Sequence, residues 1–255
     1  MKKVKTKLIA LALFFMAFSL PGQDYKVAVS GQKKVVIKEV NRVSVEAYDG
    51  TEIQITSDSE RERSERAQGL KSLSARGQDN TGIGLNVTTE GGEITIFQVA
   101  SRGEGKYKIR IPKSMNLEIE HTGNWEGGKI EIYKVTGELE ISGRYNSVYM
   151  EDITGPAVVN TVYGGIEAKF TALSQAGPTS LVSVYGDVDI TLPSNSKANI
   201  KAKTPYGEAY SDLNIEFPKE DGLRKMSSTI EGKLNGGGVS LDIQASYQNV
   251  YLRKK

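Results

Sequence analysis

One short pattern of aromatic, small and apolar residues recurs along the second half of the chain. It reads RYNSVYM, VYGGIEA, VYGDVDI and PYGEAYS in turn. The first aromatic residues of these segments are separated by 18, 22 and 21 positions, at Tyr145, Tyr163, Tyr185 and Tyr206. Self-similarity at a period near twenty predicts a stack of repeated coils, in which each coil buries its apolar face against the next.

The repeat extends in both directions. Trp125 precedes Tyr145 by one further step of the same length. Tyr247 follows Tyr206 by about two steps, which predicts one poorly matched coil between these two tyrosines. A longer self-match aligns IPKSMNLEIEHTGNW with LPSNSKANIKAKTPY at a constant offset of about four coils.

Residues at fixed positions before each aromatic residue indicate which side chains point inward. The residues four positions before it are apolar: Ile141, Val159, Leu181, Ala202 and Ile243. The residues two positions before it are small: Gly143, Thr161, Ser183, Thr204 and Ala245. Polar residues such as Glu140 and Lys201 alternate with them, and this period of two is typical of β-strands with one solvated face.

A glycine follows three of the tyrosines, at Gly164, Gly186 and Gly207. We expect these glycines to turn the chain with a positive φ, which glycine adopts without steric cost. This parity places the tyrosines on the inner side of a corner, where coils about 4.8 Å apart let their rings stack. The alternative is an exposed aromatic stripe that binds sugar rings. We predict a structural aromatic ladder of Trp125, Tyr145, Tyr163, Tyr185, Tyr206 and Tyr247.

The remaining segments are read from local patterns. Residues 25–56 alternate as four short strands, with Asp49 and Gly50 as a hairpin or corner turn, and form the first coils or a closing sheet. Residues 57–73 carry a capping box, Ser59 with Glu62, and predict one short helix. Strands follow near residues 84–88, 93–99 and 106–111, and residues 217–238 interrupt the coils as a loop or hairpin.

Residues 1–22 have the composition of a secretory signal peptide. Four lysines precede an apolar run from Leu8 to Phe18, and SLPGQD then predicts cleavage near Gly22. The run is short for a membrane span, so we expect an exported protein with no membrane span in the mature chain. Without those four lysines, the 33 basic residues of the chain become 29 against 31 acidic ones, a balance that argues against nucleic-acid binding.

Reactive side chains are scarce. The chain has no cysteine and a single histidine, His121, so a cysteine nucleophile is excluded and a zinc site or serine triad would depend on one residue. We expect His121 to be a surface or corner histidine, and Asp79 to form an Asx-type turn rather than a calcium site. We predict no catalytic residue, no metal site and no cofactor.

Outward carboxylates leave one enzymatic alternative open. Two of them at a suitable separation could cleave a glycoside, or could eliminate across a uronic acid with calcium and a base. We prefer to interpret them as the solvated face of strands. The carboxylates concerned are Glu138, Glu140, Glu151, Asp152, Glu167, Asp187, Asp189 and Glu208.

The segments IRIPKSMNLEIEHTGNWEGG and DITLPSNSKANIKAKTPYGEA, with the turn glycines and repeated acids, resemble a known family. It is the family of exported β-strand-repeat proteins called "putative adhesins", related to the head domains of bacterial auto-transporter adhesins. GLKSLSARGQDNTGIGL resembles a variant in secreted members of Bacteroidetes type. The resemblance spans about Val35 to Leu252 and implies a right-handed, single-stranded parallel β-helix outside the cytoplasm. It carries over no catalytic residues, and the helix near 59–68 and the insertion after Phe217 depart from it.

The combined prediction is an all-β protein, a parallel β-helix (β-solenoid) with coils of about 20–22 positions each and one short helix. Residues 1–22 are the signal peptide, and residues 23–255 form one domain: strands or a cap at 23–56, the helix at 57–73, and coils at 84–252 with the insertion at 217–238.

The predicted function is non-enzymatic. We expect a protein of the periplasm or cell surface with an adhesin-like binding or scaffold role, which uses its β faces or turns to bind an envelope protein or a glycan. Two alternatives stay open. One is a carbohydrate-active enzyme or sugar-binding module, and the other is a structural protein that assembles end to end.

Overall fold

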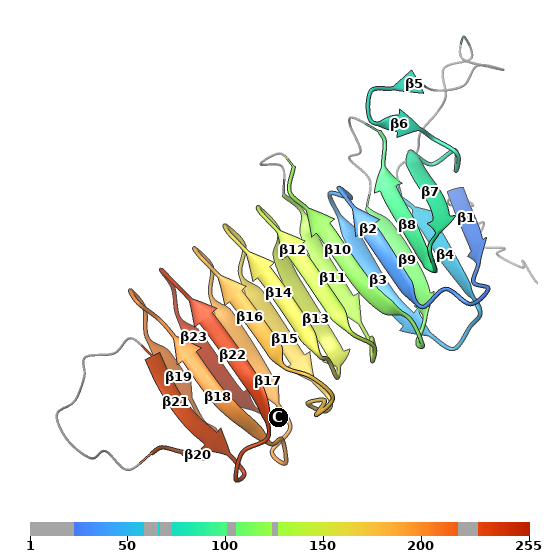
Figure 1. The fold of residues 1–255 in the computed structure, drawn as a ribbon. Helices are drawn as coiled ribbons and strands as arrows, with labels where there is room; N and C mark the ends of the chain where they lie inside the picture. The colour runs from blue at the N-terminus through green and yellow to red at the C-terminus, as the bar shows by residue number, and fades with distance from the viewer. Residues whose placement is uncertain (1–22, 59–65, 67–72, 101–105, 124–126, 219–228) are drawn as a thin grey trace, which may run out of the picture.

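The computed structural model describes residues 23–58, 66, 73–100, 106–123, 127–218 and 229–255. In these residues the chain forms 23 β-strands and no α-helix. Two mixed sheets, of ten and eleven strands, lie along an elongated stack (Figure 1), and a two-stranded sheet, β5 (Leu73–Ser74) with β6 (Gly77–Gln78), stands apart from them. The prediction of an all-β chain is confirmed.

The ten-stranded sheet is called sheet A, and neither of its edges closes on the other. Its strands, in spatial order, are β1 (Gln23–Ala28), β4 (Glu52–Ser57), β9 (Tyr107–Pro112), β3 (Val43–Tyr48), β11 (Lys129–Tyr133), β13 (Ser147–Ile153), β15 (Ile166–Phe170), β17 (Val188–Leu192), β23 (Val250–Lys254) and β19 (Ala209–Ser211).

The eleven-stranded sheet, sheet B, is also open. Its strands, in spatial order, are β20 (Ile215–Glu216), β21 (Thr229–Leu234), β18 (Ala198–Lys203), β22 (Val239–Ala245), β16 (Thr179–Ser183), β14 (Ala157–Thr161), β12 (Leu139–Gly143), β10 (Asn116–His121), β2 (Lys34–Lys38), β8 (Glu93–Gln98) and β7 (Leu85–Glu90).

Successive strands between β10 and β17 alternate between the two sheets. A coil here means two consecutive strands, the first in sheet B and the second in sheet A. Each coil pairs in parallel with the next, so that Ile141 of β12 lies opposite Val159 of β14 and Val148 of β13 lies opposite Ile166 of β15. Equivalent residues of neighbouring coils therefore lie on one line across each sheet.

The core lies between the two sheets. All the residues expected four and two positions before each tyrosine are buried. So are Val148, Ile166, Val188 and Val250 after the corner, whereas Ala209 at the end of sheet A is half-buried. Burying an aliphatic side chain of this size contributes roughly 1.5–3 kcal/mol, and because no coil can bury both its faces alone, stability depends on the stack.

The spatial order of the coils differs from their order in sequence at both ends. Coil β2–β3 lies between β8–β9 and β10–β11, and coil β22–β23 lies between β16–β17 and β18–β19 (Figure 1). The prediction that a poorly matched coil separates Tyr206 from Tyr247 is wrong. The C-terminal coil instead folds back into the stack, before the coil of Tyr206.

The long internal self-match marks the two places where the chain leaves a gap. From β9 to β10 the chain passes over the position of β2, and from β17 to β18 it passes over the position of β22. The matched segments carry Pro112 and Pro193 near their starts, at or just after the end of a sheet A strand. The two matched segments are therefore alike because each leads into a crossing over one coil position, and not because they lie four equal coils apart.

Antiparallel strands form three of the four edges of sheets A and B. They are β1 against β4, β7 against β8, and the pair β20–β21 against β18. The strands expected over residues 25–56 form, but Asp49 and Gly50 do not make a hairpin, because β3 and β4 lie on opposite sides of β9. β20, just before the predicted insertion, pairs in the antiparallel direction with β21 inside it, and residues 219–228 lie outside the described residues.

The predicted helix over residues 57–73 falls mainly outside the described residues, on 59–65 and 67–72. Its two ends are wrong, because Ser57 closes β4 and Leu73 opens β5, where backbone pairing with neighbouring strands replaces helical bonds. The predicted signal peptide, residues 1–22, also lies outside. Among the residues described, no helix is long and apolar enough to span a membrane.

Candidate binding site

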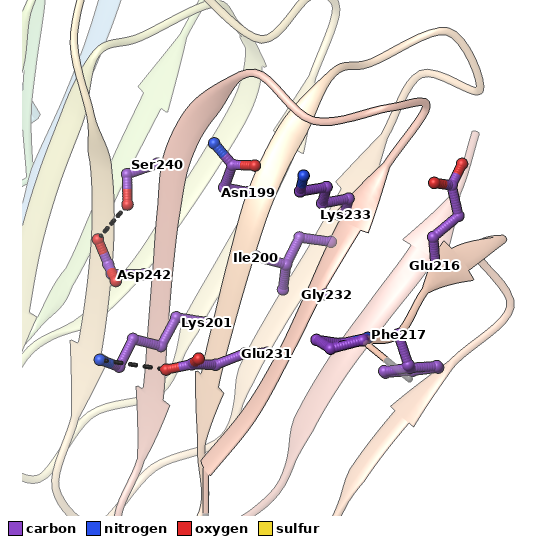
Figure 2. Close-up of a pocket in the computed structure, with 11 residues that line it drawn as sticks. Asn199, Ile200, Lys201, Glu216, Phe217, Glu231, Gly232, Lys233, Ser240 and Asp242 are labelled. Atoms are coloured by element: carbon purple, nitrogen blue, oxygen red, sulfur yellow. Dashed lines mark hydrogen bonds and ion pairs between the residues drawn. The ribbon is translucent and has the colours of Figure 1, made fainter. Parts of the chain in front are cut away.

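A groove of about 720 Å³ opens on the outward face of sheet B at its C-terminal end. Strands β18, β20, β21 and β22 form it (Figure 2), and the alternation of each strand directs every second side chain into it. A concave site of this size, with several polar groups directed into it, is the usual form of a ligand-binding site.

Charged and amide side chains line most of the groove. Lys201 on β18 forms an ion pair with Glu231 on β21 at 3.5 Å, and the Ser240 hydroxyl on β22 donates to Asp242 at 2.8 Å (Figure 2). Lys233 and Glu216, also in the lining, form no ion pair with any residue that the structure describes.

One aromatic residue belongs to the lining, at the edge of the sheet. Phe217, directly after β20, is 62% exposed although phenylalanine is usually buried. Gly232 on β21 lies beside it, and a Cβ at that position would be 3.4 Å from the Phe217 ring and would overlap Ile215. The glycine therefore lets β20 and the phenylalanine approach β21 closely.

This combination suits a polar ring compound. The apolar face of a sugar can pack on an exposed aromatic ring, while its hydroxyls bond to carboxylate, amide and ammonium groups at the ring edge. No group of three or more histidine and acidic side chains that could hold a metal ion occurs in the described part of the chain. The lining thus offers both an apolar surface and polar groups to a ligand.

The tyrosines stack in one column at the corner between the two sheets. Neighbouring rings lie 4.9–5.1 Å apart at 6–11°, in the order Tyr145, Tyr163, Tyr185, Tyr247 and Tyr206. The spacing matches one strand separation, about 4.8 Å, because the backbone hydrogen bonds between neighbouring coils continue through the corner. For example, the amide of Tyr185 donates to Val162 at 2.8 Å, and that of Tyr247 donates to Val184 at 3.0 Å.

The column lies on the outside of the corner, so the expectation of inward-pointing tyrosines is wrong. Tyr185 is 46% exposed and Tyr206, at the end of the column, is 75% exposed. Each ring within the column covers the faces of its neighbours and leaves only edges to solvent. Sugar rings pack on aromatic faces, so the column is a poor sugar platform. Trp125, the predicted first member, lies outside the described residues.

The three predicted turn glycines do not act through a positive φ, so that expectation is wrong. They are needed because backbones approach closely at the corner. A Cβ on Gly186 would lie 2.5 Å from the carbonyl oxygen of Gly164, and one on Gly164 would overlap the carbonyl of Asn146. A Cβ on Gly207 would overlap the carbonyl of Gln248. Stacked corners thus leave no room for side chains.

The outward carboxylates are divided between the two sheets and mostly have structural partners. Glu140 lies on β12 of sheet B, whereas Glu151 lies on β13 of sheet A and accepts from the Tyr149 hydroxyl at 2.5 Å. On sheet A, Asp189 forms two parallel bonds with Arg253, and Glu167 pairs with Lys169 at 3.0 Å. Glu167 and Asp189 lie opposite each other on neighbouring strands of sheet A, and each of them has a basic partner.

The structure contradicts a surface position for His121 and confirms the Asx-type turn of Asp79. His121 ends β10 next to the corner but is only 5% exposed, so of the two predicted alternatives, surface or corner, the surface one is wrong. Its Nδ1 has no hydrogen-bond partner among the residues described. Asp79 forms the expected Asx-type turn, because its carboxylate accepts from the amides of Thr81, Gly82 and Gly84 at 2.8–3.0 Å. The turn uses both carboxylate oxygens.

No protein-family model matches the chain, and no curated protein matches it. Two solved structures have a similar arrangement. A "putative cell adhesion protein" from Clostridium sporogenes has a TM-score of 0.45 and 11% identity over 92% of this chain and 100% of its own. A "putative adhesin" from Bacteroides fragilis has a TM-score of 0.39 and 11% identity over 93% and 98%. Likeness at this level carries no functional information.

The groove was not predicted from the sequence. Alternation in residues 198–203 indicates that Asn199 and Lys201 face outward, but the neighbours of β18 could not be inferred. β22 lies beside it only because the C-terminal coil folds back, and β21 lies on its other side in the antiparallel direction. The one local signal was Phe217, an aromatic residue at the start of the interruption.

Proposed function

We propose that the protein is an exported, non-enzymatic binding protein with an adhesin-like role, which holds a glycan in the groove of β18, β20, β21 and β22. The observation that carries this proposal is an exposed aromatic residue, Phe217, in one lining with Lys233 and Glu216, whose charges lack ion-pair partners among the residues described. An unpaired charge and an exposed ring at one concave site favour a ligand.

We further propose that the alternating strands form a right-handed β-solenoid whose coils enclose the core. The parallel, in-register pairing of equivalent strands from β10 to β17 supports this description. Such a stack presents a rigid outer face over its whole length, which suits a protein that contacts a large partner outside the cytoplasm. Amino-terminal sequencing of the protein from its cell tests the export proposal, which expects a chain that begins at Gln23.

A glycan array with the purified protein tests the binding proposal. We expect Phe217→Ala and Asp242→Asn to weaken binding of the retained glycan at least tenfold, which corresponds to about 1.4 kcal/mol. The matched controls are Tyr210→Ala, an exposed aromatic residue outside the groove, and Glu140→Gln, an outward carboxylate elsewhere on sheet B. Both controls should bind like the wild type.

Product formation is followed in the same samples, as reducing ends and as unsaturated uronate absorbance. Release of either product would contradict the non-enzymatic assignment. If neither groove variant weakens the binding of a retained glycan, the glycan binds outside the groove. If the array retains no glycan, the expected ligand becomes a protein partner of the envelope.

A further inference from the structure

The C-terminal coil occupies a slot between two parts of the stack that do not contact each other through strand pairing. β22 pairs on one side with β16 and on the other with β18, and β23 pairs in the same way with β17 and β19 (Figure 1). β16 and β18 have no mutual pairing. The continuity of both sheets at this position therefore depends on residues 239–255.

The coil makes apolar, aromatic and polar contacts in the slot. Apolar side chains of β22 and β23 are buried in it, and the ring of Tyr247 lies between Tyr185 and Tyr206, 4.9 Å from each. On sheet A, Arg253 binds the Asp189 carboxylate at 2.8 Å, and the Lys255 amide donates to Leu192 at 2.9 Å. The buried apolar residues of the coil are Leu241, Ile243, Ala245, Val250 and Leu252.

A short hinge leads into the coil. Leu234 at the end of β21 and Val239 at the start of β22 both lie opposite Ala198, on its two sides. They are therefore separated by two strand spacings, about 10 Å, and the chain between them must pass around the start of β18. Asn235, Gly236 and Gly237 all have a positive φ, between 50° and 89°, as in a tight reversal.

We propose that the C-terminal coil exchanges between two copies of this chain, so that residues 239–255 of each copy fill the slot of the other. The coil makes the same contacts in the slot whether it stays in its own copy or exchanges. The free energies of the monomer and the exchanged dimer therefore differ mainly by the conformation of the hinge and the entropy of association. In the exchanged dimer each groove takes Ser240 and Asp242 from the other copy. The proposal does not depend on what the groove binds.

Single cysteines report the exchange directly, because the natural chain has no cysteine. Val182 on β16 lies opposite Gln244 on β22, at a parallel-strand separation that a disulfide can bridge. Full-length Val182→Cys and Gln244→Cys chains are mixed at high concentration, unfolded together in urea, refolded and oxidised. A disulfide between the two chains forms only when the coil of one copy occupies the slot of the other.

The matched control is a mixture of Val158→Cys and Ser180→Cys chains, whose positions lie opposite each other on β14 and β16, outside the exchanging coil. We expect at least a tenfold excess of linked heterodimer from the first mixture over the control. Equal yields from the two mixtures would overturn the proposal.

Deletion of Gly236 and Gly237 provides a second test. Three peptide steps then join Leu234 to Val239, and these span at most about 10 Å when fully extended, which leaves no length for the path around β18. We expect this variant to be dimeric by light scattering and to retain its β-sheet circular dichroism. A folded, monomeric variant would overturn the proposal, and if the variant fails to fold, the cysteine mixtures with the natural hinge decide the result.

Discussion

Tyr247 stacks directly on Tyr185, with ring centroids 4.9 Å apart and planes inclined by 11°, although the coil that contains Tyr206 lies between them in sequence. The stack places Tyr247 between Tyr185 and Tyr206 because the C-terminal coil folds back into the sheets. Continuous backbone pairing through the corners then aligns the rings. The ladder thus reports the spatial order of the coils.

Removal of a central ring should cost more stability than removal of the terminal ring. Tyr185 stacks on two rings and Tyr206 on one, and each stacked pair contributes roughly 0.5–1.5 kcal/mol. We expect Tyr185→Ala to lower the free energy of unfolding by about 1–3 kcal/mol and Tyr206→Ala by about half as much, as measured by urea denaturation.

Tyr185→Phe is the control for this comparison, because it keeps the ring and should remain within about 0.5 kcal/mol of the wild type. Unchanged stability in Tyr185→Ala, together with lost retention on glycans, would contradict the structural role of the stack and restore the sugar-platform interpretation.

Gly186→Ala should be strongly destabilising although the glycine has no unusual φ. A methyl group would lie 2.5 Å from the backbone of Gly164 in the neighbouring coil, where backbone cannot move as a side chain can. We expect a loss of about 2–3 kcal/mol in thermal or urea unfolding. Gly31→Ala is the control, with a φ of 87° but no atom within 4 Å. An equal or greater cost at Gly31 would show that backbone conformation, not close approach, sets the penalty.

The sequence predicts the all-β class and the buried columns because both follow from local alternation. Ile141 and Val159 belong to one column in sequence and lie opposite each other in the structure. The position of β22 could not be predicted in this way. Its pattern fits any coil of the stack, and only the gap that the chain leaves between β17 and β18 determines where it inserts. The groove depends on that insertion, so it was missed as well.

Asn146 offers a test of the packing between corners. Its side chain is fully buried, and its amide nitrogen donates to the Gly128 carbonyl at 2.9 Å, while its Oδ1 has no partner among the residues that the structure describes. Asn146→Ala removes one donor from a partly buried carbonyl and should cost about 1–3 kcal/mol. Asn146→Asp should cost more at pH 7, because a buried carboxylate would face carbonyl oxygens without a donor.

The pH dependence of the two variants distinguishes charge from packing. Burial and the neighbouring carbonyls should raise the pKa of the new carboxyl in the folded state, so protonation at low pH should restore stability to Asn146→Asp but not to Asn146→Ala. Urea unfolding at pH 7 and pH 4 measures the difference. A gap between the variants that does not narrow at pH 4 would contradict a buried carboxylate at this position.

Glu39 should stabilise the protein only above its folded pKa. Burial alone would raise the pKa of this carboxyl, but hydrogen bonds from the Thr122 hydroxyl, the Thr122 amide and the Gly123 amide, together with the nearby His121, lower it below the usual 4.5. A carboxyl with a lowered folded pKa contributes stability that is complete above its unfolded pKa and is lost as pH falls through the folded value.

Glu39→Gln should therefore be less stable than the wild type at pH 7, by about 1 kcal/mol for a partly exposed group. The difference should shrink as pH falls below 4.5 and the wild-type carboxyl is protonated. Urea unfolding between pH 7 and pH 2.5 measures it. Glu90→Gln, at the exposed end of β7, should follow the wild-type curve at every pH. A constant difference between Glu39→Gln and the wild type would mean that the side-chain shape, rather than its charge, holds the Thr122–Gly123 turn against β2.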